Sequence, residues 1–276
     1  MTFTEKNIFF RAGIAFCGLS ALLLGAVSYF VIPVYSTMEQ NARRPANFFQ
    51  VLIGRFLEAD YLSVHISLIL VVLFSIVAMI FIYIFFEQTP APEILYIAIF
   101  TISFSFETIR LLLPLRLIFD IPLLYLLIAT RVLLFARYFS LFSLFAASIC
   151  AAGLEVQNTR NMILAIFIAT LVLTVSIPID TQNWDTSLNL LKGYNSMFRL
   201  LETVAFITTV VGFFIAVNVR GSKEYAYIGF GVMLALIGRY LLLSADNWIS
   251  PVPGILLLSF GTWFICSKLH KMHLWM

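Results

Sequence analysis

The stretch AGIAFCGLSALLLGAVSYFVIPVY, residues 12–35, decides the class of fold, because it is 24 residues long and carries no charged side chain. A helix rises about 1.5 Å per residue, so roughly 20 apolar residues cross the ~30 Å hydrocarbon core of a bilayer. The run is too long for the ~7–15-residue apolar region of a secretory signal peptide, and no small-residue cleavage site follows it. We therefore predict an uncleaved transmembrane helix.

The rest of the chain has the same character. Of its 276 residues, 62% are hydrophobic and 11% are charged, and the mean hydropathy is +1.00. A soluble domain is about 45–50% apolar and about 25% charged, so this composition indicates that lipid surrounds most of the chain. The apolar residues form continuous runs rather than the alternating ~10-residue segments of a membrane barrel. We predict an all-α fold, a polytopic transmembrane helix bundle.

The length criterion predicts about eight spans, one N-terminal anchor helix and then seven, separated by proline- and glycine-containing turns. They are Ala12–Tyr35, Leu62–Phe86, Glu93–Leu113, Pro122–Ala152, Met162–Ile179, Met197–Val219, Tyr225–Ser244 and Ile249–Cys266. The fourth is 31 residues long and contains Arg131 and Arg137. Whether it tilts, protrudes or breaks near an arginine stays open at this point.

The spans divide the chain into four parts. The connection after the first span contains ANFFQVLIGRFLEA, residues 46–59, whose aromatic and aliphatic residues recur at helical spacing, which is typical of a helix lying in the membrane interface. The predicted parts are a tail and first helix (1–35), an extracytoplasmic connection with this amphipathic helix (36–61), a seven-helix bundle (62–268) and a basic, aromatic tail (269–276).

Lysine and arginine near the span ends predict the orientation, because these residues are retained on the cytoplasmic side. With the N-terminus inside, the inner ends carry seven of them (Lys6, Arg11, Arg160, Arg220, Lys223, Lys268 and Lys271) and the outer ends five (Arg43, Arg44, Arg55, Arg116 and Lys192). We expect a multi-pass protein of the cell (inner) membrane with both termini in the cytoplasm.

Several classes of chemistry lack support in the sequence. The net charge of +3 comes without a basic run interleaved with aromatic residues, so nucleic-acid binding is not expected. The cysteines at 17, 150 and 266 lie in apolar runs without metal-ligand spacing, and we expect them to pack as small hydrophobic residues. No catalytic or phosphate-loop motif is present, and we predict no catalytic residue, no cofactor and no metal site.

Charged residues inside the spans are the main pointer to function. The segment SFSFETIRLLLPLRL (103–117) contains Glu107 and Arg110, and NSMFRLLETVAF (195–206) contains Arg199 and Glu202. Counted from the span ends, these and other polar residues fall in the outer third of the bilayer. The candidate ligand-binding residues are Arg110, Arg131, Arg199, Arg239, Glu107, Glu202, His65 and Asp246.

A charge in mid-bilayer costs from about 2.5 to over 10 kcal/mol, so these residues are expected to converge on one polar cavity entered from the outer face. The three-residue spacing places each Glu/Arg pair on one helix face. Arginines in excess of glutamates favour an anion, since guanidinium groups match carboxylates and phosphates. Arg137 is expected on another helix face than Arg131. The alternative is that the arginines extend to the lipid headgroups and the pairs only fix helix packing.

The order of one anchor helix, an extracytoplasmic segment and seven closely spaced helices resembles the bacterial seven-helix sensor modules of the diverse intracellular signalling type. The resemblance covers Leu62–Cys266 and concerns architecture. It implies that a ligand is detected and that the change is passed to a separate partner. We therefore expect a binding or sensory protein for an anionic small molecule or lipid headgroup, acting through a cytoplasmic or membrane protein.

Two other functions stay open. A secondary transporter, or a membrane subunit of a transport complex, is favoured by the matched Glu/Arg pairs in oppositely running helices, as an inverted repeat requires. A structural or scaffold subunit is the third interpretation, in which the charges only hold the bundle together.

Overall fold

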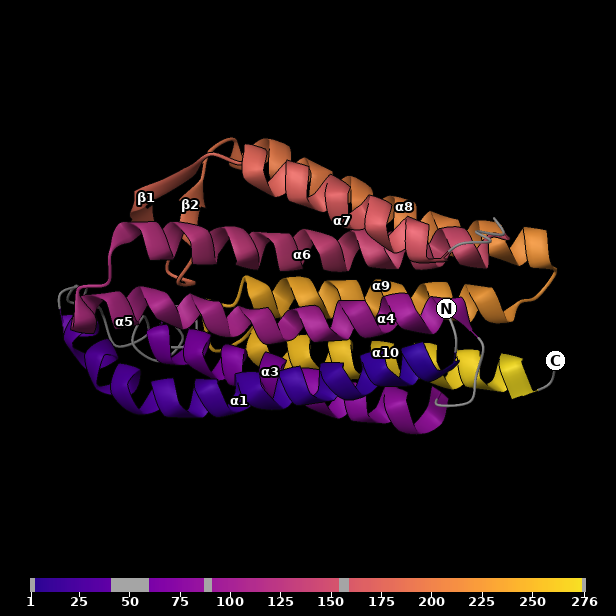
Figure 1. Ribbon diagram of the computed structural model, residues 1–276, viewed down its shortest axis with the longest axis horizontal. Coiled ribbons are helices and arrows are strands. Elements are labelled where there is room, and N and C mark those ends of the chain that lie inside the picture. Colours follow the sequence, from indigo (N-terminus) through magenta and orange to yellow (C-terminus); the bar gives the residue numbers. More distant parts are fainter. Residues whose placement is uncertain (1–2, 41–59, 87–90, 154–158, 275–276) are drawn as a thin grey trace, which may run out of the picture.

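The computed structural model describes residues 3–40, 60–86, 91–153 and 159–274. Within these ranges, eight helical segments are long and apolar enough to cross a membrane. They run roughly along one long axis, and both termini lie at the same end of the bundle (Figure 1). The predicted all-α bundle and the number of long apolar helices are confirmed for the described part of the chain.

The helical elements are α1 (Phe3–Gln40), α3 (Tyr61–Phe86), α4 (Pro92–Ser103), the 3₁₀ helix η1 (Phe104–Leu111), α5 (Leu112–Phe119), α6 (Leu123–Ala151), α7 (Thr159–Ser176), α8 (Asn195–Arg220), α9 (Glu224–Leu243) and α10 (Pro251–Leu274). The helix α6 is continuous, which settles the question of a break near its arginines. The helix α10 extends to Leu274, so most of the predicted tail is helical. The predicted amphipathic helix at 46–59 lies outside the described residues.

The third span is longer than predicted. It comprises α4, η1 and α5 and reaches Phe119, whereas we expected Pro114 to end it near Leu113. Pro114 is the third residue of α5, directly after η1, so it lies just past the point where the 3₁₀ helix changes to an α-helix and does not end the segment. The segment ends at Asp120, which has a left-handed backbone conformation, shortly before Pro122.

A β-hairpin between α7 and α8 was not predicted. Strand β1 (Ile179–Trp184) pairs antiparallel with β2 (Leu190–Lys192), at the end of the bundle opposite the termini (Figure 1). Its turn is held by Asp185, whose carboxylate accepts from the backbone N–H of Thr186 at 2.8 Å and whose own N–H donates to the carbonyl of Asn189 at 2.8 Å. The fold is therefore a helix bundle with a hairpin on one end.

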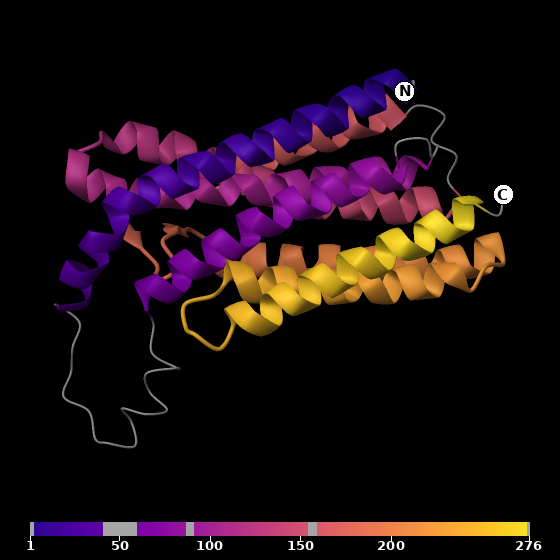
Figure 2. The ribbon, with the colours of Figure 1, turned by 90° about the horizontal axis from the view of Figure 1, so that it is seen from below.

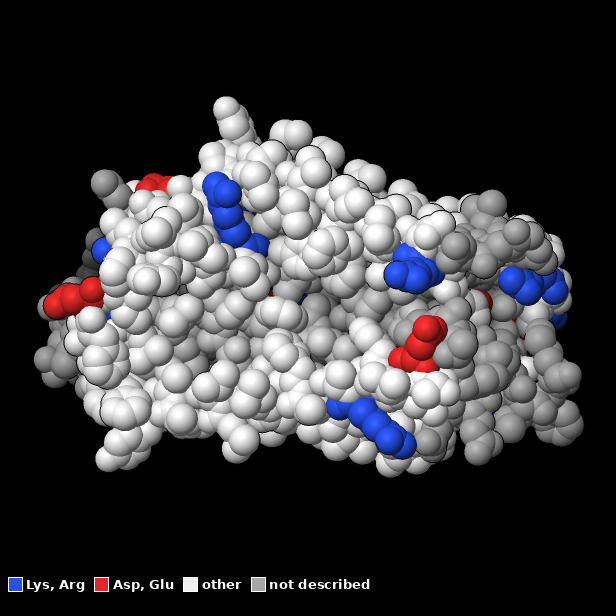
Figure 3. All heavy atoms as spheres, in the orientation of Figure 1, with Lys and Arg blue, Asp and Glu red and all other residues white. Residues whose placement is uncertain are grey.

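The third span and α6 form the centre of the bundle. In the most apolar stretch of Pro92–Phe119, 78% of the residues are buried, against 11% in α7, which lies with α8 in an outer layer (Figure 1). On another side, α3 lies between α1 and α10 (Figure 2). The face seen in Figure 3 carries few charged side chains, and many large apolar side chains are exposed, as a lipid-facing surface requires.

Helices α9 and α10 approach each other backbone to backbone. A Cβ atom added at Gly238 would lie 2.7 Å from the carbonyl oxygen of Gly254, and one added at Gly261 would lie 2.6 Å from the nitrogen of Ala235. Small residues at such positions let helices pack closely where lipid supplies no hydrophobic driving force. We name this contact the α9–α10 seam. The expected burial of all three cysteines is confirmed.

Candidate functional site

Glu107 forms the centre of the candidate site. It lies in η1, and only 1% of its surface is exposed. Arg137 of α6 meets it with two parallel hydrogen bonds, Nε to Oε1 at 2.7 Å and Nη2 to Oε2 at 2.6 Å. This side-by-side geometry is the strong form of the guanidinium–carboxylate pair, so Glu107 ties the third span to α6.

Arg110 lies on the same face of η1 as Glu107. A 3₁₀ helix has three residues per turn, so side chains three apart are aligned, and the Arg110 Nη1 lies 3.6 Å from the Glu107 Oε2. Arg110 is 3% exposed, and its Nη2 donates to the backbone carbonyl of Ser187 at the tip of the hairpin. Its Nε is buried without a hydrogen-bond partner.

A third guanidinium comes from α9. Arg239 is buried, and its Nη2 donates to the backbone carbonyl of Arg137 at 3.0 Å. Glu107 interacts electrostatically with all three arginines. The residue before Arg239 is Gly238, which belongs to the α9–α10 seam. One face of α9 therefore packs closely against α10, while Arg239 points into the bundle.

Lys192 and Glu202 complete the group. Lys192 ends β2, its Nζ lies 5.8 Å from the ring centroid of Tyr138, and it interacts with Glu202, Arg239 and Glu107. Burial, and to a smaller extent the neighbouring Arg137, lower the pKa of Lys192 to about 8. We use the name charge cluster for Glu107, Arg110, Arg137, Lys192, Glu202 and Arg239.

The charge cluster holds more positive than negative charge. Its four cationic side chains face two carboxylates, and the exposed Asp185 of the hairpin adds a third carboxylate, which interacts with Arg110. Exposed charges are screened by water, so Asp185 compensates a buried guanidinium less than Glu107 does. The cluster thus offers a net positive environment beneath the hairpin.

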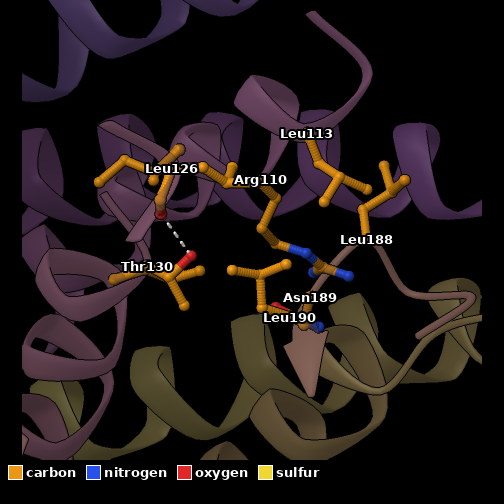
Figure 4. A pocket seen from close by; sticks show the side chains of 9 residues that line it. Arg110, Leu113, Leu126, Thr130, Leu188, Asn189 and Leu190 are labelled. Carbon is orange, nitrogen blue, oxygen red and sulfur yellow. Dashed lines mark hydrogen bonds between the residues drawn. The ribbon is translucent and has the colours of Figure 1, made fainter. Parts of the chain in front are cut away.

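The hairpin tip closes the cluster. Leu188 is buried against apolar residues of α1, α3, α5 and α6, in a left-handed backbone conformation (φ 57°) that is unfavourable for a leucine. Arg110 points toward Leu188 and Asn189, and Thr130 lies on the far wall (Figure 4). The cavity between them is about 10 Å³, the space of about one water molecule.

The structure brings four of the predicted site residues together, Glu107, Arg110, Glu202 and Arg239. Arg199 is exposed, and among the described residues no ion pair joins it to Glu202, so the expected second Glu/Arg pair does not form. In an α-helix, two side chains three residues apart point about 60° away from each other around the helix axis. Arg199 therefore points outward, whereas Glu202 points inward.

The other predicted residues lie apart from the charge cluster. Arg131 is partly buried on α6, and its Nε has no hydrogen-bond partner. His65 is buried with its Nδ1 3.4 Å from the Tyr35 hydroxyl, and Tyr35 in turn interacts with Arg110. Asp246 lies in the α9–α10 connection, where its carbonyl accepts from the N–H of Asp60 at 2.8 Å.

Arg137 and Lys192 are the members that the sequence did not reveal. We expected Arg137 on a different helix face from Arg131, and we assigned the site to Arg131, whereas the structure pairs Arg137 with Glu107. Lys192 was counted as an outer loop residue, and only the hairpin carries it to the cluster. No group of three acidic, histidine or cysteine residues suited to a metal ion occurs within the described ranges.

Comparison of the chain with protein-family models, with curated proteins and with solved structures found no match.

Proposed function

We propose that the chain is a multi-pass protein of the cell membrane, with both termini in the cytoplasm. The eight apolar helical segments support this placement, as does the position of both termini at one end of the bundle (Figure 1). The excess of lysine and arginine near that end supports a cytoplasmic orientation. The hairpin then lies at the outer side, and the charge cluster extends from it toward the middle of the bundle, where Glu107 and Arg137 lie halfway along their helices.

We propose that the protein binds a small anion with a carboxylate or phosphate group at the charge cluster. The observation that carries this proposal is the free edge of Arg110, where Nε has no partner and Nη2 meets only a backbone carbonyl. Arg137 presents the same pair of atoms to the carboxylate of Glu107. A ligand carboxylate or phosphate that replaced the Ser187 carbonyl would receive two parallel hydrogen bonds instead of one.

Binding at this edge requires that the hairpin tip move, because the present cavity holds about one water molecule. The cluster joins η1, α6 and α9, so an anion that drew Arg110 away from Glu107 would alter contacts among three spans. A 3₁₀ stretch within a longer helix often marks a hinge. These features support a sensory protein that passes the change to a cytoplasmic or membrane partner.

The experiment is thermal unfolding of the purified protein in detergent against a panel of carboxylates, phosphates and lipids. A ligand of the folded state stabilises it by about 2.7 kcal/mol at a hundred times its dissociation constant. The Arg110→Lys variant keeps the positive charge but lacks the paired N–H donors of the guanidinium group. The anion should therefore no longer stabilise it against thermal unfolding. Arg199→Lys, on an exposed arginine, is the matched control and should still be stabilised.

The binding proposal fails if no anion stabilises the wild type, or if Arg110→Lys responds as the wild type does. Transport of a labelled anion into proteoliposomes would instead favour the transporter, which stays a prediction. If variants of the cluster lower stability without changing any ligand response, the scaffold interpretation is favoured.

A further inference from the structure

The end of the bundle that carries the termini holds a second buried carboxylate. Glu93 lies in the first turn of α4 and is 4% exposed. Its Oε2 has no hydrogen-bond partner, and among the described residues no ion pair involves it. An ionised carboxylate that is buried without a partner is strongly unfavourable, so a bound positive charge would stabilise the charged form of this group.

Other polar side chains lie near Glu93. Tyr96, one turn later on α4, is fully buried, and its hydroxyl interacts with the thiol of Cys150 on α6. Glu93 interacts electrostatically with Tyr96, with Cys150 and with Tyr225 of α9. Polar groups from three helices are therefore coupled to this carboxylate.

The cationic side chains at this end have other hydrogen-bond or ion-pair partners. Arg220 donates to the backbone carbonyls of Ala151 at 3.3 Å and Cys150 at 3.4 Å, and it interacts electrostatically with Cys150 and Tyr225. Lys6 donates to the backbone carbonyl of Phe86 at 2.8 Å. Lys268 pairs with Glu224 at 3.0 Å. None of these three forms an ion pair with Glu93.

We propose that Glu93, Tyr96 and Tyr225 form a second site that binds a small monovalent cation, with Na⁺ as its probe. Hard cations take oxygen ligands, which a carboxylate and two phenol groups supply. A single carboxylate balances a single positive charge, whereas divalent sites in proteins usually draw on more acidic ligands. The site is separate from the charge cluster, because Glu107 lies 14 residues further along the same span, which is about 21 Å of helix at 1.5 Å per residue.

The test compares thermal unfolding in sodium chloride and in choline chloride at equal concentration, so that the anion and the ionic strength stay constant. Wild-type protein should be stabilised by Na⁺ in a saturable manner. Glu93→Gln should lose the shift, and Tyr96→Phe should need at least several-fold more Na⁺ for the same shift. Glu224→Gln, which changes a carboxylate already paired with Lys268, should behave as the wild type.

Equal unfolding of the wild type in both salts would overturn the proposal, as would a Na⁺ shift that survives in Glu93→Gln. Isothermal titration of the wild type with Na⁺ supplies a direct reading if Glu93→Gln does not fold, and absence of saturable heat there also counts against the site. Arg110→Lys should retain the Na⁺ shift. Failure of the anion site therefore leaves this result intact, and the reverse also holds.

Discussion

Glu107 and Glu93 lie on the same span, Pro92–Phe119, and both are almost completely buried. Glu93 lies in the first turn of this span, whereas Glu107 lies near its middle. Glu107 is held by Arg137 with two hydrogen bonds and has Arg110 and Arg239 nearby, whereas Glu93 has no hydrogen bond or ion pair within the described residues. Burial alone therefore does not define the role of a carboxylate in this bundle. The partners of each carboxylate define its role. Glu107 orients three arginines, whereas Glu93 is left available for the proposed ligand.

The largest expected effect comes from breaking the ion pair of Glu107. Glu107→Gln removes the counter-charge of Arg137 and Arg110 and leaves buried guanidinium groups uncompensated. Losing one partner of a buried pair costs about 3–5 kcal/mol. Thermal or denaturant unfolding in detergent measures this loss, with Glu224→Gln as the control, which should cost less than about 1 kcal/mol. A small effect at Glu107 would mean that the pair contributes little to the fold.

The hairpin tip above the charge cluster is the next test. Leu188→Ala removes a buried side chain from the apolar cluster that the tip shares with residues of four helices, and such changes cost about 2–5 kcal/mol in a closed core. We expect about 2 kcal/mol, because the tip lies at the edge of the bundle. Hydrogen exchange at the hairpin should rise and anion binding should tighten, since the tip opens more readily.

Leu191→Ala, on an exposed leucine of β2, is the matched control for Leu188 and should leave both properties near the wild type. Weaker anion binding in Leu188→Ala would show that the tip forms part of the binding surface rather than its cover.

The anion response should depend on pH through Lys192. The groups that face this lysine are Arg137, Glu202, Arg239, Glu107 and Tyr138. Its pKa is lowered to about 8, so it carries its charge below pH 8 and loses it above. Anion affinity should therefore fall above that value, by about tenfold per pH unit at most, which is about 1.4 kcal/mol. Titrations at pH 7 and pH 9 measure the change, and Lys192→Met should be insensitive to it.

Without an anion, the lowered pKa of Lys192 has the opposite effect, because the folded protein becomes more stable as the pH rises. An unfolded lysine has a pKa near 10.5, so between pH 8 and 10.5 the unfolded chain binds more protons and the folded state gains stability as the pH rises. A wild-type stability that fell over this window, compared with Lys192→Met, would contradict the assignment.

The smallest expected effect lies at the unpaired carboxylate, Glu93. Glu93→Gln keeps the shape of the side chain and removes a carboxylate that forms no ion pair with a described residue, so in sodium-free buffer its stability should lie within about 1 kcal/mol of the wild type or above it. Unfolding in choline chloride measures this. A loss comparable to that of Glu107→Gln would mean that Glu93 has a partner in the folded protein and would remove the contrast between the two carboxylates.

Much of the fold was predictable because apolar runs of sufficient length indicate helices directly. The Glu107–Arg110 pair was predictable because local spacing decides it. Arg137 was missed for a physical reason, since the spacing shows that Arg131 and Arg137 face different ways but not which of them faces the third span. The hairpin at 179–192 was missed because its turn residues read as an ordinary loop, and its insertion among four helices depends on packing that local sequence does not encode.

The α9–α10 seam has a mechanical consequence. Where two helices touch backbone to backbone, as at Gly238 and Gly261, little space separates them, so we expect them to move together. Arg239 lies near one end of this contact, and α10, with 24 residues, is about 36 Å long and reaches the end of the bundle that carries the termini. We therefore expect a displacement of Arg239 to move α10 along its whole length.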